Sequence, residues 1–130
     1  MLFRSLQDSG VVVEGLRIWG SPHTPRFFDW AFNVDRGEPL RRLWARIPEG
    51  LDVLVTHGPP HGVLDLNLHG EPVGCEALRE AVLRVRPRLH VFGHIHEAWG
   101  RAMLGGTECV NASNCDVAYR NLQPPILVEI

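Results

Sequence analysis

The segments LDVLVT (51–56) and RLHVFG (88–93) flank the segment CEALREAVLRVR (75–86), and this succession decides the fold class. The two outer segments are short, largely apolar runs, which are typical of strands buried on both faces of a sheet. The middle segment is amphipathic, because its apolar residues recur at helical spacing: Cys75, Leu78, Val82 and Val85. A strand, a helix and a second strand predict a βαβ crossover, with the two strands parallel and adjacent or nearly so.

Shorter elements are expected on either side of this unit. Residues 11–20 predict two short strands around Gly15, and residues 39–46 predict a short helix. Further on, a Gly-Gly turn (105–106) predicts an antiparallel hairpin, and residues 126–130 predict a final strand. The expected class is therefore α/β, with parallel strands followed by an antiparallel hairpin section.

Histidines follow both buried strands directly. His57 comes after strand 51–56, and His94 and His96 come after strand 88–93. Ligands of open α/β sheets bind beyond the carboxyl ends of parallel strands, and an extended chain would place His94 and His96 on one side. One such histidine alone is more often a surface or hydrogen-bonded residue. Three converging imidazoles predict a site for a divalent transition metal.

Composition limits the other classes of function. The 130 residues suffice for one domain, and the formal net charge of −2 gives no basic patch for nucleic acid or an anionic membrane. The three cysteines contain no C-x-x-C pair, which favours reduced thiols over a disulfide framework or a cysteine-based zinc site. No apolar run reaches the ~18 residues of a membrane span. No secretion signal is visible either, so a cytoplasmic location is expected.

The motif THGPP (56–60) followed by GHIH (93–96) resembles the last two motif blocks of the calcineurin-like metallophosphoesterases. The similarity extends over nearly the whole chain, and it is greatest to the metallophosphoesterase-domain-containing subgroup that includes vertebrate brain-expressed members. The resemblance implies the C-terminal half of a metallophosphoesterase-type β-sandwich flanked by helices.

The resemblance also implies a chemistry. Complete members of this family hydrolyse phosphoesters with a hydroxide held between two divalent ions such as Mn, Fe or Zn. By resemblance, His57 and His94 would bind one metal ion and His96 the other. Some relatives in the brain-expressed group have Gly in place of His94, whereas this chain keeps the imidazole.

Three further motif blocks of the family have no counterpart in this sequence. They are Asp-x-His, Gly-Asp-x-x-Asp and Gly-Asn-His-Asp/Glu, which supply the bridging aspartate, other ligands and the acid histidine. Residues 1–130 are therefore expected to form a single partial metallophosphoesterase domain, with no identified catalytic acid. Three imidazoles without a carboxylate are expected to hold at most one metal ion. Exposed sheet surface is expected to favour self-association or a separate N-terminal half as partner.

Four further residues are predicted to line a substrate pocket near the metal: His23, His61, Asn111 and Ser113. For His23 and His61, solvent-facing loop histidines are an equally good interpretation. His90 lies inside a predicted strand and is interpreted as structural.

The leading functional hypothesis is a metal-dependent phosphoesterase acting on a phosphodiester or nucleotide-like substrate, with little activity for this chain alone. Two alternatives remain open from the sequence. One is a non-catalytic binding or partner module that retains the fold. The other is a mononuclear hydrolase with three histidine ligands.

Overall fold

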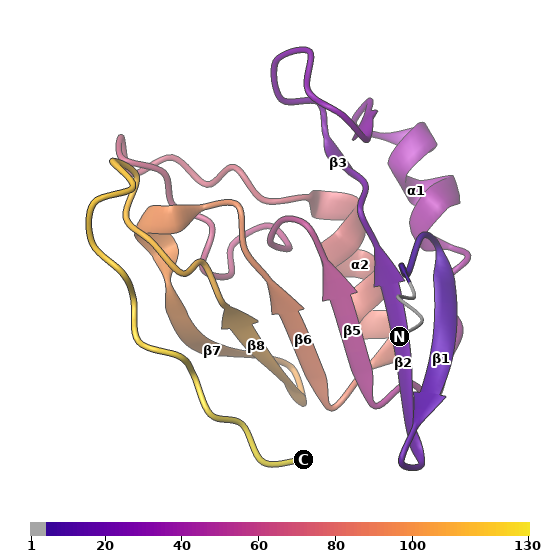
Figure 1. Cartoon of the computed structure of the whole chain (residues 1–130). Coiled ribbons are helices and arrows are strands. Elements are labelled where there is room, and N and C mark those ends of the chain that lie inside the picture. Colours follow the sequence, from indigo (N-terminus) through magenta and orange to yellow (C-terminus); the bar gives the residue numbers. More distant parts are fainter. Residues whose placement is uncertain (1–4) are drawn as a thin grey trace.

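A six-stranded sheet in the order β1-β2-β5-β6-β8-β7 forms the centre of the computed structural model, which describes residues 5–130 (Figure 1). Its strands, in chain order, are β1 (Ser9–Val13), β2 (Leu16–Ser21), β5 (Val53–Thr56), β6 (Leu89–Phe92), β7 (Gly100–Leu104) and β8 (Thr107–Asn111). The inner four, β2, β5, β6 and β8, are parallel, whereas β1 and β7 pair antiparallel at the two edges. The predicted adjacent parallel strands, the two short strands around Gly15 and the hairpin around the Gly-Gly turn are all confirmed, and the two strands around Gly15 pair antiparallel.

Two helices, α1 (Glu38–Trp44) and α2 (Glu76–Val85), cover one face of this sheet (Figure 1). Helix α2 begins where the Cys75 thiol accepts the backbone N–H of Leu78 at 3.3 Å, and it ends at left-handed Arg86 (φ 52°). The main core lies between the helices and the sheet, and its buried members include Leu40, Trp44, Leu54, Leu78, Val82, Phe92 and Cys109. The predicted amphipathic stripe is therefore the face of α2 that packs on the sheet.

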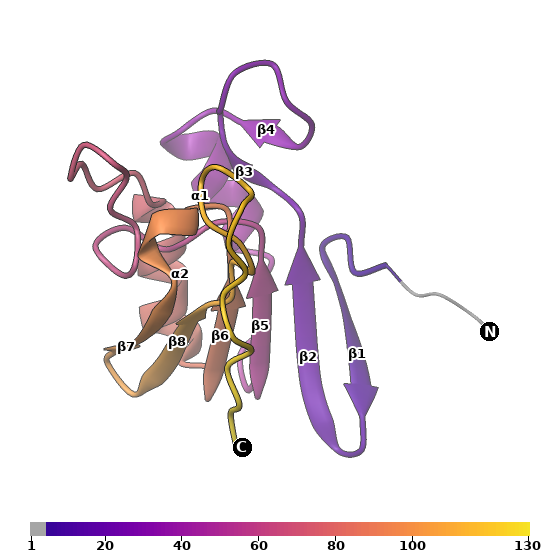
Figure 2. The same ribbon diagram turned by 60° about the vertical axis from the view of Figure 1, so that its left-hand side comes forward.

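The opposite face of the sheet, here called the open face, carries a smaller apolar cluster. Its members on the strands are Ile18, Val53, Leu89, Val91 and Val110. Among the described residues outside the strands, Ile126 and Val128 of the C-terminal tail (114–130) pack against it. This tail runs along the sheet without helix or strand (Figures 1 and 2).

The predicted strand over residues 126–130 is wrong, and two features explain its absence. Pro124 and Pro125 precede the segment and cannot donate backbone hydrogen bonds. The segment also lies on the open face of the sheet, where Ile126 and Val128 pack on the apolar cluster instead of pairing along an edge strand.

A loop rich in aromatic residues projects past the carboxyl end of the sheet, at the top of Figure 1. It joins the short parallel pair β3 (Thr24–Pro25) and β4 (Asn33–Val34). The Asn33 side chain closes the loop, because its amide donates to the Phe28 carbonyl at 2.8 Å and accepts from the Phe27 N–H at 3.0 Å. The spacing of the aromatic residues was compatible with either a strand or an ordered loop. In the structure the segment is largely an ordered loop.

Within residues 5–130, the structure contains no helix with the length and apolar character needed to cross a bilayer.

Candidate active site

His57 and His94 meet at the carboxyl ends of β5 and β6. Nε2 of His57 lies 3.1 Å from Nδ1 of His94, and the ring centroids are 4.6 Å apart. The backbone reinforces the approach, since the Gly93 N–H donates to the His57 carbonyl at 3.0 Å. The pairing of two adjacent parallel strands therefore brings these two predicted residues together.

Both imidazoles of this pair are neutral near pH 7. Burial lowers the pKa of His57. Burial, followed by the neighbouring His57 and His96, lowers the pKa of His94 to about 4. The neutral ring is the form that binds a metal ion through a nitrogen lone pair.

His94 adopts a left-handed backbone conformation, with φ 71°. A side chain other than glycine in this region costs on the order of 1–2 kcal/mol. The extended chain that would place His94 and His96 on one side is therefore not present, because the chain turns at His94 and continues into a single 3-10 turn (His96–Ala98).

The same turn separates His96 from the pair. Nδ1 of His96 lies 3.2 Å from the Asp116 carbonyl and 3.6 Å from the Cys115 sulfur, and its ring meets Tyr119 edge-on at 5.4 Å. A carbonyl only accepts hydrogen bonds, so Nδ1 of His96 carries a proton in this contact. Backbone carbonyls hold metal-binding histidines in this way.

The three histidines do not form one compact ligand set. Among residues 5–130, no three His, Cys, Asp or Glu side chains come close enough to hold one metal ion together. The His57–His94 pair fits two imidazole ligands of one metal site. The described residues do not fit a two-metal centre, because they bring no bridging carboxylate to the pair.

Two of the predicted pocket residues, His23 and His61, form their contacts away from the His57–His94 pair. Nδ1 of His23 lies 3.2 Å from the Asp8 carboxylate and 3.3 Å from the Ser21 hydroxyl. The backbone of His61 binds the start of α2, with its N–H on the Cys75 carbonyl at 3.0 Å. Neither residue lines the cavity described below.

Asn111 and Ser113 are both buried beneath the GHIH turn. Asn111 is fully buried, and its amide is bonded on both sides to backbone groups. The Ser113 hydroxyl is buried near Gly93 and has no hydrogen-bond partner among the described residues. Asn111 therefore bonds backbone groups and lines neither of the two cavities described below.

A cavity of about 400 Å³, here called the main cavity, opens beside His94 and His96. Aromatic side chains of two distant segments wall it: Phe27, Trp30 and Tyr119. Its charged lining residues are Arg26, Arg36 and Glu97. A second cavity of about 340 Å³ lies between the aromatic loop and the His57–His94 pair. Phe27 lines both cavities, and its ring is 4.8 Å from that of His94.

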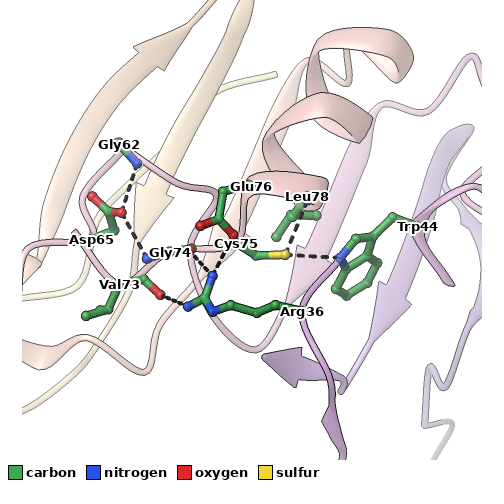
Figure 3. A network of polar contacts seen from close by, with 9 residues as sticks. All are labelled: Arg36, Trp44, Gly62, Asp65, Val73, Gly74, Cys75, Glu76 and Leu78. Atoms are coloured by element: carbon green, nitrogen blue, oxygen red, sulfur yellow. Dashed lines mark hydrogen bonds and ion pairs between the residues drawn. The ribbon is translucent and has the colours of Figure 1, made fainter. Parts of the chain in front are cut away.

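Arg36 lines the main cavity and is held in a network of polar contacts (Figure 3). Its guanidinium donates to the carbonyls of Val73 and Gly74, each at 2.8 Å, and pairs with Glu76 at 2.6 Å. Buried Asp65 holds the same loop from the other side by accepting the Gly74 N–H at 2.9 Å. Neither Arg36 nor Tyr119 was identified from the sequence, because their roles depend on contacts between segments far apart in the chain.

Known proteins resemble this chain in sequence and in fold. Metallophosphoesterase domain-containing protein 1 of Homo sapiens is 52% identical over 127 residues, which cover 96% of this chain and 39% of that protein. UPF0046 protein T07D4.2 of Caenorhabditis elegans is 40% identical over 126 residues, 96% of this chain and 32% of that protein. A crystal structure that is 18% identical superimposes with a TM-score of 0.64, covering 84% of this chain and 45% of the other.

The chain thus spans less than half of the length of these relatives. No family model matches it. The expected fold class is confirmed by the mixed sheet, the two helices and the solved structure. On these similarities, the chain belongs to the metallophosphoesterase family, with the THGPP and GHIH segments at the carboxyl edge of its parallel strands.

Proposed function

We propose that this chain contributes part of a metal-dependent phosphoesterase site for a phosphodiester or nucleotide-like substrate. The observation that carries the proposal is the 3.1 Å contact between His57 and His94 beside two cavities with aromatic walls. Neutral imidazoles offer lone pairs to a divalent ion such as Mn, Fe or Zn. Phe27 and Trp30 offer flat apolar surface to the organic part of an ester.

Each group has a distinct task in this proposal. A bound metal ion would supply a hydroxide and neutralise charge on the phosphoryl oxygens. His57 and His94 would bind it, while His96 offers a second, separately oriented Nε2. Arg26 lines the main cavity and would attract the phosphate, although it also pairs with Asp35 at 2.7 Å.

We propose at most one metal ion for this chain alone, and a partner for the full site. The missing carboxylates would come from a separate N-terminal half or from self-association. The open face supports this part of the proposal, because within residues 5–130 two side chains outside the strands, Ile126 and Val128, pack on its apolar cluster. The three free cysteines are in keeping with a cytoplasmic location.

The test is bound metal per chain, measured by elemental analysis, together with hydrolysis of bis-p-nitrophenyl phosphate. The variant is His57→Ala/His94→Ala. His69→Ala is the matched control, because His69 is exposed in the loop between β5 and α2. We expect one metal ion or fewer per wild-type chain, and loss of binding only in the double variant. Unchanged metal content in the double variant would contradict the ligand assignment.

Two other outcomes would point to the alternative functions. A melting temperature unaffected by EDTA, with no bound metal, would favour the non-catalytic binding module. One tightly bound metal ion with weak hydrolysis by the isolated chain would favour the mononuclear hydrolase. The separate position of His96 counts against the latter, since only two imidazoles meet directly.

A further inference from the structure

Asn111 lies at the junction of three segments that surround the histidine pair. It is the last residue of β8 and faces Phe92 of β6 in the strand register. Its side chain is fully buried and donates from Nδ2 to the Ile95 carbonyl at 2.8 Å and to the Leu64 carbonyl at 3.3 Å. Its Oδ1 accepts the backbone N–H of Ser113 at 3.1 Å. One amide therefore ties β8, the GHIH turn and the loop between β5 and α2 together.

Both carbonyls that Asn111 binds belong to strained turns. Leu64 has φ 52°, and Ile95 directly follows His94, which has φ 71°. Non-glycine residues in this region persist only where surrounding contacts hold them. The Asn111 amide donates one N–H to each of the two turns, so it helps to hold both left-handed conformations in place.

We infer that Asn111 is a positioning residue that holds the GHIH turn so that His94 meets His57. This inference rests on the proposed function for its catalytic meaning, but not for its geometry. The side chain does not line the main cavity, so it acts through the backbone of Ile95. An acidic replacement of equal size would remove both donors and set an anion against two carbonyl oxygens.

Asn111→Asp tests the inference, and Asn114→Asp is its matched control. Asn114 lies three residues further along, its side chain is exposed, and the chemical change is the same. The first readout is the nuclear Overhauser effect between the ring protons of His57 and His94, measured by NMR without metal. We expect this signal to be lost or strongly weakened in Asn111→Asp and retained in Asn114→Asp, while methyl spectra show a folded core in both.

The second readout is the affinity for Zn²⁺ alone, measured by titration calorimetry. Removal of groups that orient metal-binding side chains typically weakens metal affinity about 10–100-fold, and we expect a loss in this range for Asn111→Asp. Asn111→Ser, which removes the amide without adding charge, should give the same result in a less disruptive way. Loss of folding in both variants would contradict a role confined to positioning.

An unchanged His57–His94 contact in both Asn111 variants would overturn the inference. Failure of the proposed function would look different, since the wild-type chain would then show the ring contact but bind no Zn²⁺. The NMR readout also separates positioning from general stabilisation. A merely structural role would lower the melting temperature and leave the ring contact in place in the folded protein.

Discussion

Nε2 of His90 lies 2.8 Å from Oγ1 of Thr56 on the neighbouring strand, and His90 is completely buried. The Thr56 hydroxyl donates to the Gly58 carbonyl at 2.9 Å, so its oxygen accepts the proton of His90 Nε2. A short chain of hydrogen bonds thus runs from the core to the turn that carries His57. It supports the interpretation of His90 as structural.

His90 makes the protein sensitive to acid. Burial lowers the pKa of His90 to about 3 from 6.5, so at a pH between these values His90 is protonated in the unfolded chain and neutral in the folded chain. The stabilisation that neutral His90 provides is therefore complete above pH 6.5. It is lost as the pH falls towards 3, by about 1.4 kcal/mol of unfolding free energy per pH unit. His90→Gln should flatten the pH dependence measured by urea unfolding. Exposed His69→Gln should leave it unchanged, and an equal slope in His90→Gln would contradict the assignment.

The left-handed conformation of His94 predicts an unusual order of variant stabilities. Alanine at φ 71° keeps the backbone strain and loses the ring contacts, whereas glycine removes the strain. His94→Gly should therefore be more stable than His94→Ala by about 1 kcal/mol in urea unfolding, the reverse of the usual preference for alanine. Equal stabilities would mean that residue 94 is not left-handed in solution. Both variants should lose metal binding.

Cys75 begins α2 and is expected to act as its cap. Its sulfur accepts the N–H of Leu78 at 3.3 Å and the indole N–H of Trp44 at 3.4 Å, and burial raises the pKa of the thiol. Cys75→Ala should cost about 1–2 kcal/mol of unfolding free energy, since both donors lose their acceptor. Cys75→Ser keeps an acceptor and should cost less, as measured by thermal unfolding. An alanine variant more stable than the serine variant would contradict the role of residue 75 as a hydrogen-bond acceptor.

Trp30 is expected to govern substrate affinity if the proposed function is correct. It lines both cavities, whereas the equally aromatic Phe28 is 73% exposed and lines neither. Trp30→Leu should raise KM for an aromatic phosphodiester about 10-fold at unchanged kcat in an active assembly, because stacking contributes ~1–1.5 kcal/mol. Phe28→Leu is the control. A larger effect at Phe28 would place the substrate outside the cavities.

The two tail residues on the open face are expected to limit association of the chain. Ile126→Ser/Val128→Ser would remove the side chains that pack on Val53, Leu89 and Val110. The variant should lose about 1–3 kcal/mol of unfolding free energy and should self-associate more strongly in light scattering. Leu127→Ser is the control, because Leu127 between them is 82% exposed. Equal behaviour of the two variants would mean that the tail does not shield this face.

Periodicity in the sequence was sufficient for the βαβ unit and both hairpins, because buried strands and an amphipathic helix leave local patterns. Periodicity was not sufficient to predict the arrangement of the candidate active site. The position of His96 depends on the left-handed turn at His94, which no local signal marks in a residue other than glycine. Asn111 was predicted to line a substrate pocket, and no local signal indicated that its amide would bond Ile95, Leu64 and Ser113. Such roles arise from the pairing of β8 with β6, which the sequence pattern did not specify.

The C-terminal tail has a further consequence for any partner that seats on the open face. Ile126 and Val128 are joined covalently to the surface that they cover, so they act as a tethered competitor at an effective concentration on the order of millimolar. An incoming surface must first displace them, and its apparent affinity falls by the fraction of time that they are bound. For such a partner, the tail would act as a weak intramolecular inhibitor, whose strength would depend on these two side chains and on the length of chain that leads to them.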